Sequence, residues 1–203
     1  FGAIQLQGDQ AIQAYSEKFD GYRPDRIEVD LDDLKTAQNE LSADLRDAID
    51  KAYDNIYAFH KAQLTERIQL DVQDGVSCWQ EKRPIEKVGL YVPGGTAPLF
   101  SSVLMLAIPA TIAGCREIVL CTPPNQSGQL APAIRYAAYK CGVTRLFQVG
   151  GIQAIGGMTF GTQTIPKVYK ILGPGNQYVT AAKQKATQYG VSIDMPAGPS
   201  ELL

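Results

Sequence analysis

From Lys87 onward, short apolar runs typical of buried strands alternate with longer runs that have helical spacing. Strands that alternate with helices form parallel sheets, because each helix carries the chain back to the start of the next strand. The expected strands are 87–92, 117–121, 145–149, 167–172 and 191–194, and the expected helices are 99–113, 130–141, 153–160 and 176–189. The pattern therefore predicts an α/β fold, with an open parallel sheet covered by helices on both faces.

The first 86 residues have a different pattern. Helices are expected over 8–19, 32–39 and 42–63, with a short strand at 27–31, and strands over 68–72 and 77–82 are joined by Asp74-Gly75. Asp-Gly is a strong hairpin signal, and an isolated hairpin cannot bury its apolar face. We therefore expect the hairpin to pack on something outside itself. The predicted organisation is 1–86 as helices plus hairpin of an incomplete first domain, 87–198 as the α/β domain, and 199–203 as the start of a return to the first.

Charge and composition exclude several classes of protein. The formal net charge is −2 and the Lys and Arg residues are dispersed, so no basic field attracts nucleic acid or an anionic membrane. The longest apolar run, 103–113, contains a proline and is too short to cross a bilayer. No secretory leader is evident, which predicts a cytoplasmic location. The chain has one histidine and four cysteines without a Cys-x-x-Cys pair, so we expect buried thiols and no zinc site within it.

Three glycine-bearing turns follow expected strands, at 93–95, 150–151 and 173–175. Ligands of open parallel sheets bind beyond the carboxyl ends of the strands, and each of these turns precedes a helix. Glycine lets the backbone approach a ligand closely, and a helix N-terminus favours an anionic group such as pyrophosphate. The chain lacks both the G-x-G-x-x-G fingerprint and a P-loop. The residues alone predict a small-molecule site, with a nucleotide as one candidate, while a purely turn-making role for each glycine stays open.

Polar side chains stand at the same turns. Tyr91 ends the first strand of the α/β part, Gln153 opens the helix after the second turn, and Asn176 opens the helix after the third. Tyrosine stacks on or hydrogen-bonds a cofactor, and the two amides offer both donors and acceptors. The alternative is a core tyrosine and two helix caps. His60 is expected on a helix surface, and Cys78 and Cys115 are expected to be packed thiols rather than nucleophiles.

Five sequence blocks resemble the histidinol dehydrogenase family. They are Val-Gly-Leu-Tyr-Val-Pro-Gly-Gly at 88–95, Val-Leu-Met-Leu-Ala-Ile-Pro-Ala at 103–110, Gly-Gly-Ile-Gln-Ala-Ile at 150–155, Lys-Ile-Leu-Gly-Pro-Gly-Asn at 170–176, and Ile-Asp-Met-Pro-Ala-Gly-Pro-Ser-Glu at 193–201. The blocks occur in the family's order with similar gaps, and the resemblance extends over nearly the whole chain. It implies that the α/β part is a Rossmann-like, nucleotide-side domain.

The resemblance also implies an activity. The family oxidises L-histidinol to L-histidine through a bound aldehyde, in two NAD-dependent hydride transfers that use zinc, as a homodimer. Carried over to this chain, Tyr91, Gln153 and Asn176 match positions that bind NAD, and Ser200 matches a serine that contacts the substrate. A turn-capping role for Ser200 stays open. The family's zinc ligands and catalytic bases follow the last block, so the resemblance implies no catalytic or metal-binding residue in this chain, and the isolated chain is expected to be inactive.

Other interpretations stay open at this point. One is a related zinc and NAD dehydrogenase that acts on another small alcohol, such as a sulfonated one. Another is a non-catalytic nucleotide-binding or regulatory module, and a third is a structural dimerisation domain. Because the sheet of the first domain would be incomplete, we also expect exposed apolar surface before Glu86, and self-association as its consequence.

Overall fold

A computed structural model describes residues 1–94, 97–125 and 127–195. Its main feature is a six-stranded sheet with the order β1-β6-β5-β4-β7-β8. The strands are β1 (Glu28–Val29), β4 (Lys87–Tyr91), β5 (Glu117–Cys121), β6 (Arg145–Phe147), β7 (Lys170–Leu172) and β8 (Ser192–Ile193). Neighbouring strands from β4 to β8 are parallel, and β1 is antiparallel to β6. The predicted open parallel sheet is confirmed. The strand expected at 117–121 has the predicted bounds, and the other five strands of this sheet are shorter than expected.

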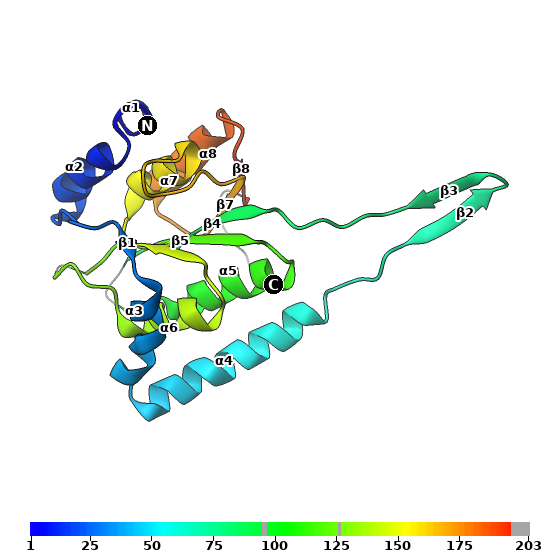
Figure 1. The fold of residues 1–203 in the computed structure, drawn as a ribbon, viewed down its shortest axis with the longest axis horizontal. Helices are drawn as coiled ribbons and strands as arrows, with labels where there is room; N and C mark the ends of the chain where they lie inside the picture. The colour runs from blue at the N-terminus through cyan, green and yellow to red at the C-terminus, as the bar shows by residue number, and fades with distance from the viewer. Residues whose placement is uncertain (95–96, 126, 196–203) are drawn as a thin grey trace, which may run out of the picture.

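Helices cover both faces of the sheet, as the alternation of elements predicted (Figure 1). On one face, α5 (Phe100–Ile112) and α6 (Pro132–Lys140) bury Leu90, Leu120 and Leu146 of the strands. On the other face, α7 (Gly151–Phe160) and α8 (Gln177–Thr187) bury Tyr91 and other residues of the same strands. The central strands are buried on both faces, so their apolar runs are continuous rather than alternating.

The N-terminal helices form an outer layer on these helices. Among them, α1 (Gly2–Gln7) and α2 (Asp9–Asp20) pack against α7, and α3 (Leu31–Thr36) with the 3-10 turn η1 (Ala37–Glu40) packs against α6. The long α4 (Ala43–Lys61) packs against α5, and Ser42 caps it by accepting a hydrogen bond from the Leu45 amide, as expected. Helix α1 was not predicted, and α3 begins one residue before the expected start. The assignment of residues 1–86 to a separate domain stays a prediction.

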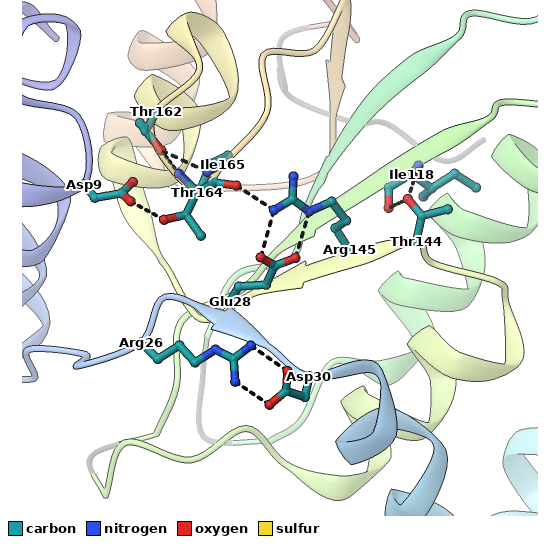
Figure 2. A network of polar contacts seen from close by, with 10 residues as sticks. All are labelled: Asp9, Arg26, Glu28, Asp30, Ile118, Thr144, Arg145, Thr162, Thr164 and Ile165. Atoms are coloured by element: carbon teal, nitrogen blue, oxygen red, sulfur yellow. Dashed lines mark hydrogen bonds and ion pairs between the residues drawn. The ribbon is translucent and has the colours of Figure 1, made fainter.

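Strand β1 is held at the edge of the sheet by a polar network (Figure 2). Arg145 of β6 donates to both carboxylate oxygens of Glu28, each at 2.8 Å, and to the Thr164 carbonyl oxygen at 2.8 Å. The hydroxyl of Thr164 in turn contacts the Asp9 carboxylate of α2. The sequence predicted a strand here but did not place it in the sheet of the α/β part, because its partner lies more than a hundred residues away.

The predicted hairpin is formed by β2 (Gln69–Gln73) and β3 (Val76–Trp79), and it projects away from the sheet and its helices (Figure 1). Its turn is at Asp74-Gly75, where Gly75 has a φ of 79°. Every residue of both strands is exposed, including large apolar side chains. The expected exposed apolar surface before Glu86 is therefore present. Within the described residues, no helix is both apolar enough and long enough to cross a membrane.

Candidate functional site at the carboxyl edge of the sheet

The order of the strands marks one point on the sheet edge. The chain runs outward from β4 through β5 to β6, then returns to place β7 on the other side of β4. The helix after β4 lies on one face of the sheet, and the helix after β7 lies on the opposite face. In open α/β sheets a ligand-binding crevice forms at such a reversal, beyond the carboxyl ends of the two diverging strands. The turns after β4 and β7 are therefore the candidate site.

Glycines bring the turns at this edge into contact. Gly173, directly after β7, has a φ of 131°, and a Cβ built on it would lie 2.0 Å from the carbonyl oxygen of Tyr91. A Cβ on Gly94 or on Gly150 would lie 2.7 Å from the side chain of Pro123, which follows β5. The predicted glycine turns thus meet along one edge, and at Gly173 the close approach of two backbones excludes any side chain. Gly95 lies outside the described residues.

Tyr91 lies beneath this edge as a core residue. Its side chain is 3% exposed, and its hydroxyl accepts a hydrogen bond of 3.0 Å from the amide of Gly151. Burial raises the pKa of the Tyr91 hydroxyl above its usual value. The ring anchors the start of α7 to the end of β4, which agrees with the structural alternative for this tyrosine.

Gln153 is the third residue of α7 and is 1% exposed. Its side-chain nitrogen donates to the Asp20 carboxylate at 3.1 Å, and Asp20 is the last residue of α2. The alternative of Gln153 as a helix cap is wrong, because Gly150 holds the cap position. Burial raises the pKa of the Asp20 carboxyl. The sequence analysis gave no signal that Asp20 reaches this edge.

Asn176 is the N-cap of α8. Its side-chain oxygen accepts hydrogen bonds from the amides of Tyr178 at 3.0 Å and Val179 at 3.1 Å. The predicted capping role is therefore confirmed, and the residue itself is exposed at the end of the turn after β7. A cap of this kind fixes the direction in which α8 leaves the edge of the sheet.

The structure links the three predicted residues through glycines. Gly151 donates to Tyr91, and a Cβ on Gly151 would lie 2.9 Å from the side-chain oxygen of Gln153. Gly173 lies against the Tyr91 carbonyl and precedes Asn176 by three residues. That all three side chains surround one shared hollow stays a prediction. Ser200, the fourth predicted residue, lies outside the described residues.

Two hollows open along this edge. The smaller, of about 90 Å³, is lined by the Gly173–Gly175 turn together with Lys183 and Asp194. The larger, of about 270 Å³, is lined by Gly94, Pro123 and other residues of the turns after β4 and β5. Neither lining, within the described part of the chain, includes Tyr91, Gln153 or Asn176. The open space described at this edge thus lies beside the predicted side chains and is lined by other residues.

The ion pair at the smaller hollow, between a buried lysine and a half-buried aspartate, was not predicted from the sequence. Lys183, 6% exposed, donates to the Gly173 carbonyl at 2.8 Å and is ion-paired with Asp194. One signal was available, because Lys183 lies four residues after Val179 and so on the buried face of the expected helix.

The histidine and the four cysteines lie away from the carboxyl edge or are packed in the protein. His60 is half-buried on α4, with its ring nitrogen 3.0 Å from the Gln63 side chain. Cys78 lies on the exposed hairpin, so its predicted burial is wrong, while Cys115 is half-buried. Cys121 and Cys141 are buried as expected, and burial raises the pKa of the Cys141 thiol to about 12. Across residues 1–94, 97–125 and 127–195, no three His, Cys, Asp or Glu side chains are grouped to hold a metal ion.

Comparison with known proteins gives consistent matches. The family described as histidinol dehydrogenase matches residues 1–203. A histidinol dehydrogenase of Bacteroides fragilis is 54% identical over 98% of this chain and 46% of its own length. One from Escherichia coli O6:H1 is 50% identical over 98% of this chain and 46% of its length. The crystal structure of histidinol dehydrogenase from Elizabethkingia anophelis superposes with a TM-score of 0.94 at 52% identity, covering 98% of this chain and 46% of that one. The chain therefore spans about half the length of these relatives.

Proposed function

Because the chain belongs to the histidinol dehydrogenase family, we propose that it is the nucleotide-side part of an NAD-dependent oxidoreductase that converts L-histidinol to L-histidine. The observation that carries the nucleotide assignment is the meeting of the β4 and β7 turns at the strand reversal. This position is the usual ligand site of open α/β sheets, and here it is bordered by glycine backbone and by the N-terminus of a helix. When bound, NAD supplies the acceptor for hydride.

The residues at this edge fit a dinucleotide in three ways. Gly173 and Gly175 let the turn after β7 pack closely against the Tyr91 carbonyl and the Val179 side chain, which brings its backbone to the start of α8, where a pyrophosphate is favoured. The side-chain oxygen of Asn176 caps the amides of Tyr178 and Val179, and in this proposal the exposed Asn176 side chain also orients the ligand. Tyr91 ties the start of α7 to the end of β4, and Gln153 ties it to the end of α2, so both residues position the helix that borders the crevice. In this proposal Tyr91, Gln153 and Asn176 are residues of the nucleotide site.

The residues that the structure describes offer no set of ligands for zinc, so no step of the reaction is assigned to zinc on this chain. The proposal places the zinc ligands and the catalytic bases in the part of the relatives that this chain does not span, and Ser200 at the substrate. The chain by itself is then predicted to bind NAD but to turn over no histidinol. The homodimer of the whole enzyme, formed in part through the exposed hairpin, belongs to the same proposal.

The proposal is tested by titrating NAD⁺ into the chain in a calorimeter. Asn176→Ala should weaken binding, because it removes both the cap and the exposed amide. The control is Ser42→Ala, which removes the equivalent cap from α4, away from the carboxyl edge, and should leave binding unchanged. NAD⁺ binding that is absent, or equally affected by both substitutions, contradicts the assignment. Formation of NADH from histidinol by the chain with added zinc contradicts the inactivity.

A further inference from the structure

The one lysine that α8 buries lies next to the candidate site. Lys183 is 6% exposed, and its ammonium group both donates to the Gly173 carbonyl at 2.8 Å and forms an ion pair with Asp194. Lysine is almost never fully buried without a partner, because removing its charge from water is costly. The position of Lys183 is therefore specified by these two contacts and not by hydrophobic packing.

Asp194, directly after β8, completes the arrangement. One of its carboxylate oxygens accepts a hydrogen bond of 2.8 Å from the amide of Gly173. The ion pair thus engages both polar groups of a single residue, the carbonyl through Lys183 and the amide through Asp194. That residue is the one whose backbone lies against the Tyr91 carbonyl oxygen, in a left-handed conformation with φ at 131°. Three separate elements, α8, β8 and β7, therefore converge on the first residue of the turn.

We propose that Lys183 and Asp194 are positioning residues of the nucleotide site, which hold the Gly173–Gly175 turn and, through it, the exposed Asn176. The inference rests on the proposed function, because it assumes that the turn binds a dinucleotide. Stability alone is a poor reason for this pair, since apolar residues of similar volume usually replace a buried ion pair at no cost. Apolar residues would make no hydrogen bonds to the Gly173 amide and carbonyl, so they would not fix the orientation of these groups.

The test uses NAD⁺ calorimetry and amide hydrogen exchange on four variants of the full chain. Asp194→Leu leaves the buried Lys183 ammonium without its carboxylate, and Lys183→Met leaves the half-buried Asp194 carboxylate without its cation, so each variant should lose both stability and NAD⁺ affinity. The double variant removes both charges, so it should regain stability, yet leave Gly173 unheld and bind NAD⁺ about tenfold more weakly than the unmodified chain, which is roughly 1.4 kcal/mol. Lys185→Met, an exposed position on the same helix, should change neither.

Two readouts separate the inference from the function on which it rests. In the double variant, the amides of Gly173, Gly175 and Asn176 should exchange faster, while those of α5 should not. Wild-type NAD⁺ affinity in the double variant, or unchanged exchange at the turn, would show that the pair acts only on stability and overturn the inference. If the unmodified chain fails to bind NAD⁺, the nucleotide role falls with the proposed function, and the exchange data still report whether the pair holds the turn.

Discussion

Gly173→Ala should destabilise the chain more than the same change at a glycine that has open space around it. The added Cβ would lie 2.0 Å from the Tyr91 carbonyl oxygen, and the backbone has a φ of 131°. A disfavoured backbone conformation costs about 1–3 kcal/mol, and forcing an atom into a packed position costs about 1–3 kcal/mol more. Because the obstructing atom belongs to the backbone of a central strand, no rotamer change relieves the clash. We expect a loss of roughly 4 kcal/mol in the free energy of unfolding.

The matched control is Gly142→Ala. Gly142 also has a positive φ, 73°, but no atom lies within 4 Å of the added Cβ. This control should cost about 1 kcal/mol, which is the backbone contribution without the clash. Urea unfolding followed by circular dichroism gives both values, and the difference between the two variants measures the contact between the β4 and β7 turns. Equal losses in the two variants would refute the close approach on which the candidate site depends.

Three further changes test other parts of the structure. Burial, and then a hydrogen bond to a carboxylate, raise the pKa of Tyr136 to about 12. The stability contributed by its hydroxyl is therefore complete below pH 10 and is lost between pH 10 and about 12. Tyr136→Phe should make the urea midpoint less dependent on pH in that range, and the exposed Tyr178→Phe should leave that dependence unchanged. Arg145→Met should cost roughly 1–3 kcal/mol, because it removes two hydrogen bonds to Glu28 of β1 and one to the Thr164 carbonyl. Arg26→Met, at an exposed ion pair, should change stability far less in the same assay. Trp79→Ser should reduce self-association in sedimentation velocity, since the exposed hairpin is its expected cause, and an unchanged distribution would exclude the hairpin.

Some features were predictable because local sequence encodes them. The continuous apolar runs at 87–92 and 117–121 became β4 and β5, since a strand buried on both faces needs no polar residues. Ser42 and Asn176 cap helices as expected, because a cap depends on residues two or three positions away. Asp74-Gly75 gave the hairpin for the same reason.

The carboxyl-edge site was predictable in outline only. The sequence placed Tyr91, Gln153 and Asn176 at turns, and the resemblance to the family gave them a ligand. The sequence did not show that Tyr91 is hydrogen-bonded to Gly151 or Gln153 to Asp20. These partners meet only because α7 and α2 pack together beside the sheet. The predicted burial of Cys78 failed because the hairpin carries it away from the core.

The sequence by itself determined the kinds of element, their order and the parallel sheet, because hydrophobic periodicity and turn chemistry act over a few residues. Only the tertiary structure decided which distant groups meet. It paired β1 with β6 through Glu28 and Arg145, and it closed Lys183 and Asp194 around Gly173. Such contacts join residues that are distant along the chain, and their energies depend on burial and geometry that exist only once the layers have packed.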